Sequence, residues 1–89
     1  ERRAMALARE QSQALRKSAK AAEADIARLE ARKSEIERAM FDPGSATPAD
    51  AERPMSALMR LLAEISADLA GAEARWLEAS EAVEKAEAA

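Results

Sequence analysis

Apolar residues recur every three or four positions along two long stretches of the chain. In the first stretch nine of eleven repeat positions are apolar: Met5, Ala8, Ser12, Leu15, Ala19, Ala22, Ile26, Leu29, Lys33, Ile36 and Met40. In the second stretch all ten are apolar: Met55, Leu58, Leu62, Ile65, Leu69, Ala72, Trp76, Ala79, Val83 and Ala86. A repeat of 3.5 residues that continues over more than four heptads predicts supercoiled helices, not strands.

The residues that break helices gather between these two stretches. All three prolines and one of the two glycines lie in the segment 42–54, and neither stretch contains a proline. Because a helix ends where proline and glycine cluster, the break divides the chain into two helical arms. We therefore expect one coiled-coil domain over residues 1–89, with a helix at about 2–41, a connection at about 42–54 and a second helix at about 55–87.

The connection carries a helix start signal of its own. Thr47 suits an N-cap, Pro48 suits the first turn, and Asp50 lies where a carboxylate helps to cap. Pro54 lacks a backbone N–H and pushes Arg53 out of helical space. We therefore expect a short helical turn near 48–52 and a kink or a restart near Pro54.

Each arm alone would expose its apolar stripe, so the arms are expected to pair. A short connection makes them antiparallel neighbours, and Pro43-Gly44 favours reversal of the chain. The predicted fold class is therefore all-α, an antiparallel two-helix coiled-coil hairpin. Pairing between two chains as an extended dimer is the alternative. The favoured register sets Trp76 against Ala22, with Ala19 one turn away, because the largest side chain then meets two small ones.

The apolar face widens beside the seam at Met59 and Leu61. We expect the connection to cover this patch, with Phe41 as the covering side chain. The alternative is that a second hairpin covers it, which would make a homodimer through Met59 and Leu61.

The composition excludes several kinds of chemistry. The chain contains no Cys and no His, which removes disulfides, thiol catalysis and ordinary zinc sites. It has no glycine-rich phosphate loop, and two helices do not enclose a cavity that excludes water. We expect no catalytic, cofactor-binding or metal-ligating residue. No apolar run approaches the roughly 20 residues that cross a bilayer, and no signal peptide opens the chain, so we expect no membrane partner and a cytoplasmic location.

Charge is unevenly distributed between the two ends. Residues 1–20 carry six cations against two carboxylates, whereas residues 73–89 carry five carboxylates against two cations. An antiparallel hairpin would place these segments side by side, so their charges favour that pairing. The basic segment is also the best candidate for contacts with nucleic-acid phosphates, with a merely solvated helix face as the alternative. Its cations are Arg2, Arg3, Arg9, Arg16, Lys17 and Lys20.

Three sequence stretches carry a family resemblance. They are Leu15-Arg16-Lys17, Ile26-Ala27-Arg28-Leu29-Glu30, and Ala72 to Glu81 with its distinctive Arg75-Trp76-Leu77-Glu78. Together they resemble the C-terminal coiled-coil extension of the ABC-F ATPases, soluble tandem-cassette relatives of ABC transporters. The resemblance spans nearly the whole chain. Met40-Phe41 departs from the Leu-Tyr-like pair that the loop of this family often carries.

The resemblance implies a non-catalytic accessory domain that contacts ribosomal RNA or DNA. It also implies ATPase cassettes elsewhere in the same chain, and the parent protein, not this segment, would bind ATP and Mg²⁺. A purely structural coiled-coil spacer or oligomerisation module is the main alternative. A tRNA-contacting arm of a synthetase would share the hairpin, but it would not predict the Trp-Leu-Glu stretch.

Overall fold

The computed structural model describes residues 1–88, and every regular element in them is helical. The elements are α1 (Arg2–Phe41), the 3-10 helix η1 (Pro43–Ser45), α2 (Pro48–Ala51) and α3 (Met55–Ala88). The prediction of an all-helical chain is therefore confirmed.

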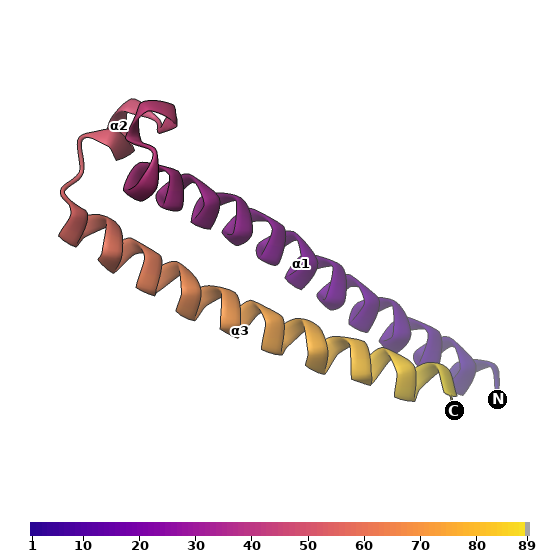
Figure 1. Cartoon of the computed structure of the whole chain (residues 1–89). Helices are drawn as coiled ribbons and strands as arrows, with labels where there is room; N and C mark the ends of the chain where they lie inside the picture. The colour runs from indigo at the N-terminus through magenta and orange to yellow at the C-terminus, as the bar shows by residue number, and fades with distance from the viewer. Residues whose placement is uncertain (89) are drawn as a thin grey trace.

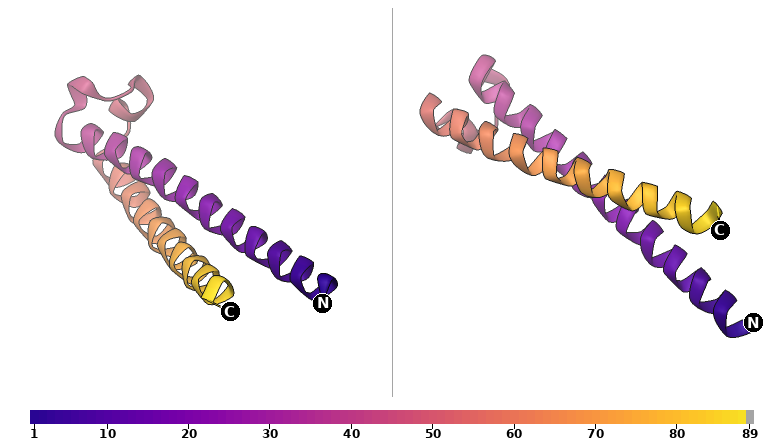
Figure 2. Two further views of the ribbon diagram at one scale, coloured as in Figure 1. Left: turned by 90° about the vertical axis from the view of Figure 1, so that its right-hand side faces the viewer. Right: turned by 90° about the horizontal axis from the view of Figure 1, so that it is seen from below.

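The molecule is extended, with dimensions of 62 × 18 × 14 Å. The long helices α1 and α3 lie side by side, η1 and α2 lie at one end of the pair, and both chain termini lie at the other end (Figure 1). The two further views show that α1 and α3 cross and separate toward the termini (Figure 2). The terminal end is therefore more open than the loop end.

The core lies in the half of the molecule next to the loop. Its buried apolar side chains are Ala22, Leu29, Ile36 and Ala39 of α1 with Leu58, Ile65, Leu69 and Ala72 of α3. Seven of these eight belong to the apolar repeat, so the repeat identified the packed stripe of each helix. Residues 1–11, in contrast, are all exposed.

The connection is built from two short helical turns, of which α2 has a side-chain cap. The Thr47 hydroxyl oxygen accepts a hydrogen bond from the Asp50 backbone N–H at 3.3 Å, which caps α2. Pro54 then interrupts the helix, and its carbonyl oxygen accepts from the N–H groups of Ala57 and Leu58 at the start of α3.

The expectation that Phe41 covers the patch at Met59 and Leu61 is wrong, because Phe41 is 78% exposed. The Asp42 N–H donates to the Arg38 carbonyl, so Phe41 stays within the last turn of α1. It follows the fully buried Ile36 by five residues, about 140° around the helix, and so points away from the seam. The loop contributes other groups: Ala46 packs against the core, and Asp50 is buried.

The position of the core predicts which leucines stabilise the fold. Leu58 is 3% exposed and Leu77 is 53% exposed, although both lie in α3. Leu58→Ala should lower the free energy of unfolding by about 2–5 kcal/mol, because it leaves a cavity between α1 and α3. Leu77→Ala should change it by about 0.5 kcal/mol or less. Urea unfolding followed by circular dichroism measures both, and equal losses would contradict this location of the core.

Candidate functional site

The six candidate cations all lie on the first half of α1, and all are exposed. Because α1 is continuous, residues seven apart lie two turns apart on nearly the same side. Arg2, Arg9 and Arg16 therefore form a row, with neighbours about 10 Å apart along the axis, and Lys20 continues it one turn further. Arg3 and Lys17 lie to one side of this row. We call Arg2, Arg9, Arg16 and Lys20 the basic row.

One member of the basic row is paired with α3. The guanidinium of Arg16 donates to the Glu87 carboxylate, with Nε 2.8 Å from Oε1. Both side chains are about half exposed, so water and salt weaken this pair and it adds little to stability. Among residues 1–88, the other five candidate cations make no ion pair. The structure thus leaves five positive charges available to a partner.

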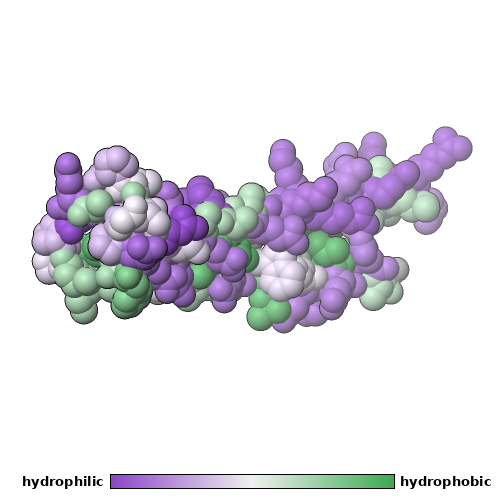
Figure 3. Space-filling view, turned by 45° about the horizontal axis from the view of Figure 1, so that its top comes forward, coloured by the Kyte–Doolittle hydropathy of each residue, from purple (hydrophilic) through white to green (hydrophobic). Residues whose placement is uncertain are grey.

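Figure 3 shows hydrophilic residues over most of the terminal end, with hydrophobic residues among them and at the loop end. Residues 1–11 are all exposed, Met5 and Leu7 included, because the core lies beside the loop.

A hollow of about 450 Å³ lies between α1 and α3, and Trp76 forms part of its wall. Its lining residues are Arg16, Ala19, Lys20, Glu23, Trp76, Ser80, Val83 and Glu84. The indole Nε1–H of Trp76 donates to Glu23 Oε1 at 3.0 Å. Ala22 is buried and Ala19 lines the hollow with Trp76, but 36% of Trp76 remains exposed. The expectation that Trp76 simply fills the seam is therefore incomplete.

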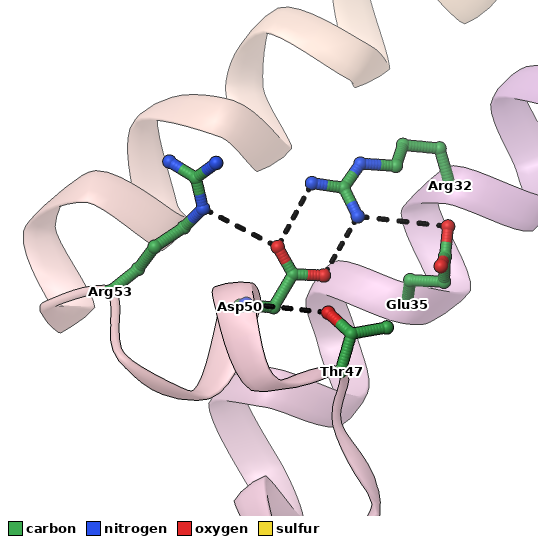
Figure 4. Close-up of polar contacts among 5 residues, drawn as sticks. All are labelled: Arg32, Glu35, Thr47, Asp50 and Arg53. Atoms are coloured by element: carbon green, nitrogen blue, oxygen red, sulfur yellow. Dashed lines mark hydrogen bonds and ion pairs between the residues drawn. The ribbon is translucent and has the colours of Figure 1, made fainter.

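A second polar cluster fixes the loop against α1 (Figure 4). Arg32 of α1 donates two hydrogen bonds to the carboxylate of Asp50 in α2, at 2.7 and 3.0 Å. Asp50 is only 2% exposed, so this fork-shaped pairing replaces the water that its carboxylate has lost. Arg53 adds a longer contact at 3.4 Å, and Glu35 lies 3.6 Å from Arg32 on the other side.

The pKa of Asp50 is lowered from an ordinary value of 3.8 to about 2, mainly by the hydrogen bonds from Arg32. The Thr47 and Arg53 contacts contribute to this lowering, whereas burial alone would raise the pKa. The sequence indicates only the capping role of Asp50. The long-range contact was missed because 18 residues separate Arg32 from Asp50, and no local pattern encodes the path of the loop.

The cluster predicts that the loop depends on the charge of Asp50. Asp50→Asn should lower the free energy of unfolding by about 1–3 kcal/mol, because the buried carboxylate accepts charge-assisted hydrogen bonds. Asp25→Asn is the matched control. Asp25 forms only surface pairs with Arg28 and Arg75, each at 3.7 Å, so its loss should cost less than about 1 kcal/mol. Urea unfolding at pH 7 gives both values.

The variant Asp50→Asn also tests how the free energy of unfolding depends on pH. Because folding lowers the pKa of Asp50, its contribution is fully present above about pH 4 and is lost as the pH falls toward 2. The stability difference between the wild type and Asp50→Asn should therefore shrink over this interval. A difference that stays constant from pH 6 to pH 2 would show that the charge of Asp50 does not hold the loop.

Two further kinds of site are absent from residues 1–88. No group of three or more Asp, Glu, His or Cys side chains lies in a position to hold a metal ion there. Over the same residues, no helix combines the length and the apolarity needed to cross a membrane.

Comparison with known protein families places most of the chain in a described family. Residues 10–81 match the family model described as ABC transporter C-terminal domain. The matched part contains the core, the whole loop and the hollow, except for Val83 and Glu84, whereas Arg2, Arg3 and Arg9 precede it. Searches of curated proteins and of solved structures gave no significant match. Because the family model covers most of its length, the chain belongs to the ABC transporter C-terminal domain family and is an accessory domain of an ABC protein.

Proposed function

We propose that this domain binds nucleic acid, either ribosomal RNA or DNA, on behalf of an ABC-F type ATPase in the cytoplasm. The observation that carries the proposal is the basic row, which begins in a part of α1 where every residue is exposed. Phosphate contacts need only positive charges that can reach the backbone, and α1 supplies them at intervals of two turns. The family match supports the accessory role, and the resemblance to ABC-F proteins supports the choice of partner.

The proposal includes an antiparallel coiled-coil hairpin as the scaffold. Contacts between the long helices run in opposite order along the two sequences: Arg16 meets Glu87, whereas Asp25, further along α1, meets Arg75, earlier in α3. Both chain ends lie at the same end of the molecule (Figure 1). This arrangement suits a rigid arm, since the core and the Arg32–Asp50 contacts hold the loop end while the basic row lies at the other.

The charge of α3 would orient the bound nucleic acid. Its last turns carry Glu78, Glu81, Glu84 and Glu87, and Lys85 is the only cation among them. Carboxylates repel phosphates, so the phosphates of a bound nucleic acid would lie along α1 and not along α3. In this proposal the domain itself is not catalytic. Cassettes elsewhere in the parent protein would bind ATP and Mg²⁺ and hydrolyse the nucleotide.

Salt dependence of binding tests the proposal. The 89-residue chain should bind structured RNA or duplex DNA at low salt, with an affinity that falls linearly on a log–log plot against salt concentration. Replacement of Arg2, Arg3 and Arg9 by Gln should weaken binding and reduce the slope by about 2 to 3. Fluorescence anisotropy with labelled nucleic acid measures affinity and slope.

The matched control removes three arginines elsewhere. Arg28, Arg38 and Arg60 are exposed and lie outside the first half of α1, so their replacement by Gln gives the same change in net charge. This control should keep the slope of the wild type. Equal losses in both triple variants would mean that net charge, not the basic row, governs binding. Absence of binding at low salt, together with a dimer in sedimentation equilibrium, would favour the oligomerisation module, with Met59 (58% exposed) and Leu61 at its interface.

A further inference from the structure

The hollow beside Trp76 lies where the basic row meets α3. Arg16 and Lys20 are both members of the row and lining residues of the hollow. A strand of nucleic acid whose phosphates follow the row would therefore pass the mouth of the hollow. A volume of about 450 Å³ lies within the range of roughly 300–1,000 Å³ that is typical of small-molecule sites.

Trp76 offers a fixed aromatic surface in this hollow. Its indole N–H is held by Glu23 at 3.0 Å, so the ring is already oriented before any ligand arrives. Ala19 and Val83 add apolar surface beside the ring, and about a third of Trp76 is open to solvent. An oriented and partly exposed indole loses little conformational freedom when a flat ligand stacks on it.

The charges around the hollow define the ligand further. Lys20 makes no ion pair among residues 1–88, whereas Arg16 is occupied by Glu87. Glu84 is exposed at the same hollow, and its carboxylate accepts hydrogen bonds but repels an anion placed inside. These groups fit a neutral, flat ligand with amino groups inside the hollow and a phosphate outside it on Lys20.

We infer that the hollow binds one unpaired nucleobase, which stacks on Trp76 while its backbone phosphate contacts Lys20. The inference rests on the proposed function and makes it more specific, because it separates unpaired from duplex nucleic acid. Adenine, cytosine and guanine carry an exocyclic amino group that can donate to Glu84 or Ser80, whereas uracil and thymine carry none. The site should therefore favour these three bases over uracil and thymine in a single strand.

Fluorescence of the protein itself reports this event. Trp76 is the only tryptophan and the chain has no tyrosine, so tryptophan emission comes from the hollow alone. Titration with single-stranded oligoadenylate should change the emission in a saturable way, with oligouridylate weaker. RNA and DNA versions of each strand distinguish the two sources of the nucleotide. A duplex of the same length should bind, which anisotropy would measure, without the same change in emission.

Two variants separate stacking from phosphate binding. Trp76→Leu keeps an apolar side chain at the seam, and it should weaken single-strand binding about 5- to 100-fold while leaving duplex binding within about twofold. Lys20→Gln changes an exposed residue and so keeps the fold. It should reduce the salt slope by about 1. Lys85→Gln, an exposed lysine of α3 that does not line the hollow, is the control and should leave single-strand binding unchanged.

The outcomes distinguish this inference from the proposed function. If nucleic acid binds but tryptophan emission stays constant, or if Trp76→Leu binds single strands as the wild type does, the base site is wrong and the proposed function stands. An equal change in emission with duplex would also overturn the base site. If neither single strands nor duplexes bind at low salt, both fail. A response to a lysine-rich peptide but to no oligonucleotide would assign the hollow to a protein partner instead.

Discussion

Burial of the apolar stripe of α1 against that of α3 is the constraint on which the rest of the structure depends. Each helix has one such stripe, and each stripe is the main apolar partner of the other. The large apolar side chains that are buried, such as Leu29, Ile36, Leu58 and Ile65, lie in the half next to the loop. In the other half the stripe of α1 consists largely of alanine and serine, and the helices separate there (Figure 2). One molecule thus has a packed end and an open end.

The ion pair at the loop end, Arg32 with Asp50, is partly buried, whereas the pair at the terminal end, Arg16 with Glu87, is exposed. Asp50 is buried and paired with Arg32 in a fixed, forked geometry, so the contact determines where the loop lies. Arg16 and Glu87 pair at the surface, where water and salt weaken the attraction and a phosphate can compete for the arginine. Polar contacts therefore fix the loop end and leave the terminal end free to exchange partners. This contrast supports a function at the terminal end.

Features that depend on local helix geometry could be predicted from the sequence, whereas features that depend on contacts between distant residues could not. The apolar repeat needs only helical geometry, so it predicted the all-helical chain and nearly all the buried positions. The pairing of Asp50 with Arg32 depends on how the loop folds back, which no local pattern records. The outward direction of Phe41, in contrast, follows from its position in the last turn of α1. The basic row is different, because the seven-residue spacing of Arg2, Arg9 and Arg16 is visible in the sequence once a continuous helix is assumed. The hollow at Trp76 required the relative position of both helices.

Hydrogen exchange along α1 shows whether the molecule has a packed loop end and an open, basic terminal end that binds nucleic acid. In the free protein the amides of 29–39 should exchange most slowly and those of 2–15 fastest, because only the former lie over the core. Addition of RNA or DNA at low salt should slow exchange in 2–20 and leave 29–39 unchanged. Uniform protection of the α1 amides in the free protein would show that the molecule has no open end. New protection at the loop end on binding would show that nucleic acid does not bind the basic end.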